Sequence, residues 1–533
     1  MIQFRYGHVA TFVPLLCTLL LTASRVQAQI QKPTPQHAPG GVMGYVKWGF
    51  GNDNAPMRLA ANSGMTFVGV GKARQGGEQL LWRVGAQGGQ TQLVQTTART
   101  ADLARGTFMN YVGRDTLPPL RLYTYVSSAA NGIRGTLAVG GTTKERLPIK
   151  AMKEGMAEYA VYPRALSASE RMRVESAMAL RHGITLNHSY FNSKGLVVRN
   201  YYRLKAYNHR VAGIIGDSTS CLYLSTGQSA EGEAAVRVAA KAIGEGASYL
   251  WGDNAKRLAF AADRGNGKWM QRRWAATTTG TPVAGMTLTL DTRSIRQLEP
   301  LGEGESYYLA VDNSGTGKFP VGQLRYYKAH MGQADSVTFM GISAGVGESV
   351  FTFRAAKDFF STIDVEQPRC STGAKGALRV LLTGGTPPYR LTASVDGKAV
   401  CVHATADSIV TVPSLTQGKY VIVAYDNGGK SLCSEVTLHN ADLADVPDLE
   451  DVSFAQGAER DYHLETKGNY ACRWKTPAGK YLDGRRVTLE EDGEYLVELT
   501  NDDGCSTLRT LNVTTATGDG FARYEVSPNP TRD

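Results

Sequence analysis

Few side chains in this sequence of 533 residues have the types and spacing that catalysis requires. The segment Gly341–Gly345 matches the G-x-S-x-G pattern of a nucleophile elbow, in which a strand leads through the serine into a helix. Alternating apolar residues stand on both sides of Ser343, so the sequence predicts a glycine-rich hairpin turn here. The Gly-Lys pairs at 71–72, 267–268 and 317–318 lack the residues that flank a phosphate-binding loop.

The acidic and histidine side chains indicate catalysis or metal binding only weakly. Glu158 is the nearest candidate for one of the two carboxylates of a glycoside hydrolase, but its place on a strand before a helix favours a structural role. His182 and His188 lie too far apart for one helical face, so they are predicted to be loop histidines and not zinc ligands. Asp312–Gly315 offers oxygen donors to calcium, but without EF-hand spacing it predicts an Asx turn. We therefore expect no catalytic residue, no metal and no cofactor.

The elements that must position these residues are mostly short strands. Period-two alternation with glycine punctuation recurs at Met65–Val70, Gln79–Val84 and Leu120–Val126, which predicts half-buried strands of an antiparallel sandwich. One helix is predicted, with Ser167 as N-cap and Glu170 closing a capping box, ending near His182 because Gly183 supplies a left-handed stop. The predicted fold class is all-β and multidomain.

Composition limits the partners. The formal net charge of +10 is spread along the chain, whereas nucleic-acid binding usually needs a clustered basic stripe. We therefore expect no nucleic-acid partner. A chain of this length should divide into about three to five domains.

The N-terminus reads as a secretory signal peptide covering residues 1–28. Arg5 precedes the apolar run Val9–Ala23, and small residues at the −3 and −1 positions predict cleavage between Ala28 and Gln29. The run is shorter than the about 20 apolar residues of a membrane helix, and no later segment is apolar for long enough. No membrane span is expected.

The C-terminus carries a short motif of its own. A strand-like entry leads into Ser527, Pro528, Asn529 and Pro530, which resembles the opening of the C-terminal sorting domain of type IX secretion cargo in the Bacteroidota. This resemblance implies a truncated start of that domain at 521–533, export by the type IX secretion machinery, and a secreted or outer-membrane cell-surface location. The alternative is a proline turn at a frayed terminus.

Internal segments resemble modules of the same surface proteins. Residues 158–186, EYAVYPRALSASERMRVESAMALRHGITL, look like the end of a laminin-G-like, concanavalin A-like domain, which implies a jelly roll at 29–189. The segments 212–217 and 307–312 are similar to landmarks that follow this domain in those proteins, and alternation again predicts a second β-sandwich at 190–360.

The rear of the chain is similar to the immunoglobulin-like repeats of gliding-motility adhesins. Gly384–Tyr389 and Ser414–Cys433 carry that resemblance, which implies an immunoglobulin-like domain at 364–440. A further immunoglobulin-like or polycystic-kidney-disease-like domain is expected at 445–516.

Six cysteines follow the signal peptide, and an exported chain meets oxidising surroundings that favour disulfides. The adhesin resemblance implies a bond between Cys370 and Cys433. Cys472 and Cys505 lie on predicted strands that could face each other across the last module, so we predict a second bond there. Cys401 has no counterpart in the repeats, so its pairing stays open, and Cys221 is predicted to be a buried thiol.

Taken together, these features predict a secreted or cell-surface, non-catalytic, adhesin-like binding or scaffold protein whose partners are glycans or other surface proteins. Two alternatives are a polysaccharide hydrolase or lyase on the jelly roll and a purely structural spacer. Four tryptophans could stack on sugars or fill cores: Trp48, Trp82, Trp251 and Trp269.

Overall fold

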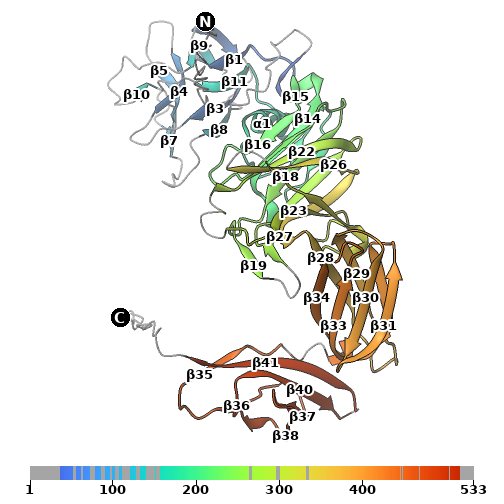
Figure 1. Ribbon diagram of the computed structural model, residues 1–533. Coiled ribbons are helices and arrows are strands. Elements are labelled where there is room, and N and C mark those ends of the chain that lie inside the picture. The colour runs from blue at the N-terminus through green and yellow to red at the C-terminus, as the bar shows by residue number, and fades with distance from the viewer. Residues whose placement is uncertain are drawn as a thin grey trace, which may run out of the picture. The chain divides into compact units, whose positions relative to one another are not determined.

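The computed structural model is a multidomain all-β protein with one α-helix among the residues it describes (Figure 1). It describes residues 37–516 with gaps at 52–55, 62–63, 73–78, 86–90, 97–98, 103–106, 111–119, 128–132, 140–149, 152–155, 263–266, 294, 296–299, 332–334, 444–445, 447, 467, 503. The predicted cleavage site at Ala28 and Gln29 and the predicted sorting motif Ser527–Pro530 lie outside the described residues. In the described part, no helix has the length and apolar run needed to cross a membrane.

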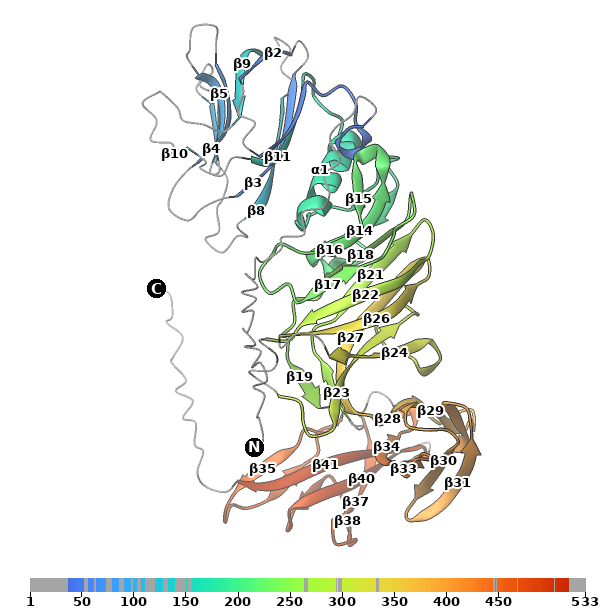
Figure 2. The ribbon, with the colours of Figure 1, turned by 45° about the horizontal axis from the view of Figure 1, so that its top comes forward.

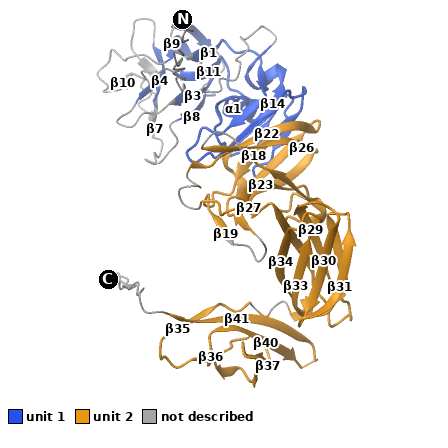
Figure 3. Cartoon of the chain, viewed as in Figure 1, with its two compact units in different colours: residues 1–201, 212–248 blue, residues 202–211, 249–533 orange. Residues whose placement is uncertain are grey.

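The chain divides into two compact units (Figure 3). The first contains Met1–Tyr201 and Ala212–Ser248, and the second contains Tyr202–Val211 and Tyr249–Asp533. The short 3-10 helices are η1 Pro39–Gly41, η2 Lys205–Tyr207, η3 Ser218–Ser220, η4 Val321–Gln323 and η5 Ala441–Leu443.

The first unit opens with a two-layer sandwich. Its strands are β1 Lys47–Gly51, β2 Met57–Ala61, β3 Met65–Lys72, β4 Gln79–Gly85, β5 Thr91–Thr96, β6 Arg99–Asp102, β7 Thr107–Asn110, β8 Leu120–Ser127, β9 Ile133–Val139, β10 Lys150–Ala151 and β11 Met156–Tyr162. One sheet has the order β1-β11-β3-β8 and the other β2-β9-β4-β5-β6-β7, and Figure 2 shows them as separate layers. Phe67 and Tyr159 from the first sheet meet Trp82 and Leu137 from the second in one core.

Helix α1, Ala168–His182, follows β11 and begins and ends as the sequence predicts. The Ser167 side chain accepts from the backbone of Glu170, and the Glu170 carboxylate accepts from the backbone of Ser167. Gly183 has φ of 66° and donates its N–H to the last turn. The remaining strands up to the end of the first unit are β12 Tyr190–Phe191, β13 Val197–Arg199, β14 His209–Asp217, β15 Leu222–Leu224, β16 Thr226–Gln228 and β17 Val236–Ala239.

The second unit starts with strands that form further sheets. They are β18 Ser248–Asp253, β19 Phe260–Ala262, β20 Lys268–Met270, β21 Trp274–Thr279, β22 Val283–Asp291, β23 Glu305–Asp312, β24 Leu324–Lys328, β25 His330–Met331, β26 Ser336–Ala344 and β27 Gly347–Lys357. Strand β27 pairs with β20, β21 and β23, whereas β26 pairs with β22 and β25.

Two compact modules complete the second unit. The first, which we call module R1, contains β28 Phe359–Glu366, β29 Gly376–Gly384, β30 Tyr389–Val395, β31 Lys398–Thr405, β32 Ile409–Leu415, β33 Gly418–Tyr425 and β34 Ser431–Leu438. The second, module R2, contains β35 Val452–Ala455, β36 Asp461–His463, β37 Tyr470–Lys475, β38 Tyr481–Asp483, β39 Arg486–Thr488, β40 Gly493–Asn501 and β41 Ser506–Ala516. Each has its own apolar core, and R1 is a sandwich of the sheets β28-β29-β32 and β31-β30-β33-β34.

Removing the helix cap should destabilise the first unit. In Ser167→Ala the backbone N–H of Glu170 loses its acceptor, so we expect the free energy of unfolding to fall by about 1 kcal/mol. Thermal unfolding of the full chain, followed by circular dichroism, measures the change. Ser169→Ala, also exposed in the first turn, is the matched control, and an equal loss in both variants would contradict the capping role.

Candidate functional site

A buried ionic cluster joins three elements of the first unit at Glu158. Glu158 lies on β11 and is fully buried. Its Oε1 accepts from Trp48 Nε1 on β1 at 3.0 Å and from Arg181 in the last turn of α1. Its Oε2 accepts from His182 Nε2 at 2.9 Å. Sheet and helix are therefore held together by one carboxylate.

Arg181 extends this cluster to the segment after the helix. Its second guanidinium nitrogen donates to the carbonyl oxygens of Ser220 at 3.2 Å and Cys221 at 3.0 Å. Its guanidinium carbon lies 5.7 Å from the centre of the Trp48 ring, within the range of a cation–π contact. Glu158 and Arg181 thus satisfy each other while both are shielded from water, as a buried ion pair requires.

The electrostatics of Glu158 give it a structural role. Burial alone would raise the pKa of its carboxyl group, but the charge of Arg181 and hydrogen bonds from His182 and Arg181 lower that pKa to about 2. A glycosidase acid needs a raised pKa and contact with substrate. Glu158 is ionised and inaccessible, so it does not meet either requirement.

A second polar group, centred on Glu175 of α1, involves the other predicted histidine. Thr124 Oγ1 donates to Glu175 at 2.7 Å, and His188 Nε2 lies 2.9 Å from Oε2. The other ring nitrogen of His188 lies 2.7 Å from the carbonyl oxygen of Ser189. Both nitrogens face acceptors, so this geometry favours the imidazolium ion. Burial would lower the pKa of His188, but the bonds to Glu175 and Ser189 raise it overall.

The structure brings neither histidine into a metal site. His188 lies in a loop, as predicted, whereas His182 is the last helical residue and not a loop residue. Across the described ranges, no group of three or more His, Cys, Asp or Glu side chains is placed to hold a metal ion. The sequence pointed to Glu158 but not to its partners, because a strand residue and residues at the end of a helix meet only after folding.

Asp312 forms the predicted Asx turn and is closed to calcium. Its carboxylate accepts from Ser314 N and Oγ, Gly317 N and Phe319 N. A carboxylate has about four lone-pair sites. Because N–H and O–H groups already point at these oxygens, they have no free lone pair for a cation.

Gly341–Ala344 form the end of β26, and the chain then enters β27, a strand and not a helix. This agrees with the predicted absence of a nucleophile elbow. Strands β26 and β27 belong to different sheets, so the expectation of a hairpin turn was wrong.

None of the four tryptophans forms an exposed stacking platform. Trp48, Trp82 and Trp251 are 8%, 0% and 1% exposed, and Trp269 is half-buried against the ring of Phe319 at 5.2 Å. Their rings fill cores, so they do not offer a flat surface to a sugar.

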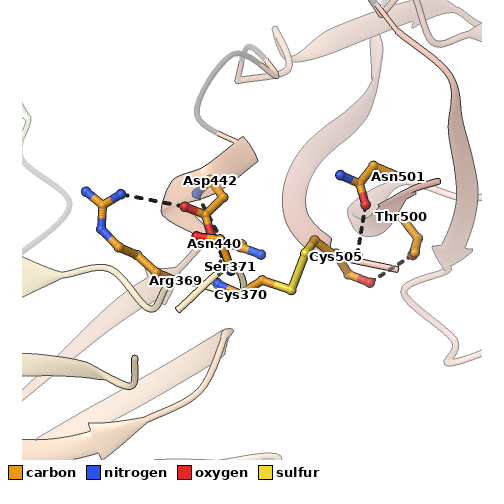
Figure 4. Close-up of a disulfide and its surroundings, with 9 residues drawn as sticks. Arg369, Cys370, Ser371, Asn440, Asp442, Thr500, Asn501 and Cys505 are labelled. Atoms are coloured by element: carbon orange, nitrogen blue, oxygen red, sulfur yellow. Dashed lines mark hydrogen bonds and ion pairs between the residues drawn. A yellow bond between two sulfur atoms is a disulfide. The ribbon is translucent and has the colours of Figure 1, made fainter. Parts of the chain in front are cut away.

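The cysteine pairing differs from both predicted bonds. Cys370 is bonded to Cys505, with alpha carbons 5.8 Å apart (Figure 4). Cys433 and Cys472 are free. The bond between Cys370 and Cys433 fails because Cys433 points outward from β34, between the buried residues Leu432 and Ser434. Cys221 is a free buried thiol, as predicted.

The predicted bond between Cys472 and Cys505 is wrong because Cys505 is bonded to Cys370, which leaves Cys472 as a free thiol. Cys472 points into the core of R2 from β37, whereas Cys505 lies in the turn before β41 and not on a strand. That turn is held by Asn501, whose side-chain oxygen accepts from Cys505 N at 2.8 Å. Cys401, whose pairing the sequence left open, is also a free thiol.

The disulfide connects R1 to R2. On the R1 side, Cys370 N donates to Asn440 Oδ1 at 3.2 Å, and Ser371 N donates to Asp442 Oδ2 at 2.7 Å (Figure 4). A second contact between the modules is ionic, with Lys419 Nζ of R1 2.6 Å from Glu494 Oε1 of R2. A cavity of about 890 Å³ beside this contact is lined by residues of both modules.

Comparisons with known proteins identify no function. A family model described as "Domain of unknown function (DUF8202)" matches residues 170–345, and no curated protein matches the chain. The crystal structure of Dpr11 IG1 bound to DIP-gamma IG+IG2 is similar at 10% identity, covering 30% of this chain and 99% of that chain, with a TM-score of 0.13.

Two larger structures align over more of this chain. The N-terminal eight Ig domains of Down Syndrome Cell Adhesion Molecule match at 9% identity, covering 87% of this chain and 73% of that chain, with a TM-score of 0.13. Trypsin-activated alpha-2-macroglobulin from Escherichia coli matches at 9% identity, covering 89% of this chain and 39% of that chain, with a TM-score of 0.16. Scores this low carry no argument about function.

Neutralising Glu158 should destabilise the first unit strongly. Glu158→Gln leaves the buried Arg181 guanidinium without its counter-charge, so we expect the free energy of unfolding to fall by about 3–5 kcal/mol. Denaturant titration of the full chain measures this, with the exposed Glu303→Gln as control. Because the pKa is lowered, the contribution of Glu158 is present above pH 4.5 and is lost as the pH falls towards about 2. A wild-type free energy of unfolding that does not change as the pH falls from 4.5 to about 2 would contradict the ionic role of Glu158.

The stability contributed by the pair of His188 and Glu175 should depend on pH in the opposite sense to that of Glu158. A raised pKa contributes stability below the unfolded value of 6.5, and this contribution is lost as the pH rises through the folded pKa. We expect His188→Asn to lower the free energy of unfolding by about 1.5–3 kcal/mol at pH 6, and to flatten its decline above neutral pH. Chemical unfolding at several pH values measures both effects, and an unchanged slope in the variant would argue against the imidazolium.

Peptide mapping should recover one disulfide. We expect a non-reducing digest to contain a peptide pair that links Cys370 to Cys505, since both lie within bonding distance. Maleimide should label the exposed Cys433 quickly and the buried Cys472 only after unfolding. Mass spectrometry distinguishes these products, and a linked pair that contains Cys433 would contradict the structure.

Proposed function

We propose that this chain is a non-catalytic, adhesin-like binding scaffold that acts outside the cell. The observation that carries the proposal is the connection between R1 and R2, where a disulfide and the ion pair of Lys419 with Glu494 join two sandwiches in tandem. A covalent link between modules restricts the motion of one against the other, which suits a protein that holds a binding surface at a distance. The disulfide link itself takes no part in a chemical reaction.

The proposed location follows from the ends of the chain and from the disulfide. The predicted signal peptide, with cleavage expected after Ala28, and the resemblance of Ser527–Pro530 to a sorting domain support export by the type IX secretion machinery to the cell surface or the medium. A structural disulfide is expected to persist in such oxidising surroundings and is rare in the cytosol.

The absence of catalysis is part of the proposal. The acid that came nearest to a glycosidase role, Glu158, is sealed within an ion-pair cluster with a pKa of about 2. The only serine in a nucleophile-elbow pattern, Ser343, is followed by a strand. Partners are glycans or other surface proteins, and the front domain at 29–189 is the proposed recognition module, through loops at one rim of its sandwich.

The proposal is tested by measuring binding and turnover on the same purified full chain. We expect it to bind a glycan on an array, or a purified outer-surface protein, and to release no reducing ends from a panel of polysaccharides. Release of reducing ends from any of these polysaccharides by the wild-type chain would establish the hydrolase instead. Failure to bind any glycan or surface protein would leave the chain as a spacer and overturn the proposed function.

A further inference from the structure

Modules R1 and R2 do not share an apolar core. The core of R1 is built from residues of R1 alone, and the core of R2 contains residues from Leu443 onward. The cavity between the modules is lined mainly by polar side chains, among them Ser434, Thr437, Thr510 and Asn512. Because water can replace the partners of such groups, moving them apart costs little. Small polar interfaces between domains permit relative motion, so we expect motion at this joint.

The joint that precedes R1 is built differently. Phe360 of β28 is fully buried and packs in one apolar cluster with Tyr308 of β23 and Ala356 of β27. The guanidinium carbon of Arg354 lies 4.4 Å from the centre of the Phe360 ring, and its Nη2 donates to the carbonyl oxygen of Ser361 at 3.1 Å. Buried apolar contacts of this kind are costly to expose to water. The joint before R1 is therefore fixed, in contrast to the polar joint after it.

The peptide chain crosses from R1 to R2 beside the disulfide. Asp442 still belongs to R1, because its Oδ2 accepts from Ser371 N at 2.7 Å. The next residue, Leu443, is buried in the core of R2, and its carbonyl oxygen accepts from Arg509 at 3.4 Å. Since Ser371 directly follows Cys370, the backbone and the disulfide cross between the modules at the same place. Two covalent crossings therefore lie at one end of the joint.

The ionic contact between the modules lies at the other end of the hairpin formed by β40 and β41. Cys505 stands in the turn of this hairpin, next to Asn501, the last residue of β40. Glu494 stands near the start of β40, where it pairs with Asn512 of β41. At about 3.3 Å per residue, the strand between Glu494 and Asn501 spans roughly 20–25 Å. On R2, the ionic contact is thus well separated from the covalent crossings.

One ammonium group makes the ionic contact. Lys419 Nζ of R1 lies 2.6 Å from Glu494 Oε1 of R2 and 3.0 Å from Glu435 Oε2 of its own module. Burial would lower the pKa of Lys419, but its hydrogen bonds to Glu494 and Glu435 raise that pKa overall, so the group stays charged. The side chains of Lys419 and Glu494 are 26% and 36% exposed. Ion pairs this accessible are weak and are screened by salt, so the contact can break.

We propose that R1 and R2 form a hinged jaw that an ionic latch holds closed over the cavity. The hinge is the pair of covalent crossings, the disulfide and the peptide bond between Asp442 and Leu443, and the latch is the ion pair of Lys419 with Glu494. Covalent crossings at one end let the modules swing but not separate. Opening widens the cavity at the Lys419 end and leaves the disulfide end fixed. This device controls access to the cavity and does not depend on the proposed binding role, because it rests only on contacts within the second unit.

Zero-length crosslinking of the full chain with a carbodiimide tests the latch. This reagent joins an amine to a carboxylate in contact, so Lys419 can react with Glu494 or with Glu435. Glu435 lies on β34, which pairs with β33, and stays within reach whether the jaw is open or closed, so its product is the internal control. Raising the salt from about 0.05 to 1 M should lower the ratio of the Glu494 product to the Glu435 product about twofold to fivefold, as mass spectrometry of the peptides measures. A constant ratio would overturn the latch.

Removal of the disulfide tests the hinge in the same assay. In the double variant Cys370→Ser and Cys505→Ser only the backbone crossing remains, so Glu494 meets Lys419 less often and the low-salt ratio should fall about twofold or more. Cys433→Ser, which removes an exposed free thiol, is the matched control and should leave the ratio unchanged. A small dithiol, which is oxidised as it reduces the disulfide to two thiols, should lower the wild-type ratio to that of the double variant, since Cys370 is exposed. An unchanged ratio in the double variant and in the reduced wild type would reject the disulfide as part of the hinge.

Discussion

Each sheet in this protein has two faces but can bury only one of them in its own sandwich, and this constraint explains much of the structure. Alternation sends every second side chain into a core, as Ile422 and Ala424 of β33 show. The residues between them must be polar or find a partner elsewhere. In β33 of module R1 they are Lys419, Val421, Val423 and Tyr425, so apolar side chains also stand on the side of this sheet that faces away from the core.

The same alternation decides the chemistry of the cysteines. Cys433 faces outward from β34 and therefore cannot reach a partner across its own sandwich, whereas Cys472 faces the core of R2 and stays a free thiol. Turns have no such restriction, and the cysteines that bond, Cys370 and Cys505, both lie in turns. The disulfide therefore joins two modules instead of clipping one, and it adds a covalent bond where the ion pair of Lys419 and Glu494 alone would be weak.

Charge burial imposes a second constraint on the first unit. Glu158 is removed from water at the junction of β1, β11 and α1, which would be costly without Arg181 and His182. The arrangement uses the end of the helix, where cations are favoured by the helix dipole. A carboxylate that is buried in such an ion pair stabilises the fold and is not available to a substrate. The energetics of the first unit are therefore consistent with the proposed non-catalytic function.

The sequence by itself determined the all-β class, the helix with its Ser167 cap and Gly183 stop, and the Asx turn at Asp312. These features depend on neighbours within a few residues, so local patterns are sufficient to predict them. Only the tertiary structure decided that Cys370 bonds Cys505, 135 residues away, and that Glu158 meets Arg181. Residues this far apart in the sequence meet only because sheets and turns pack together in space. A local sequence pattern does not predict such contacts.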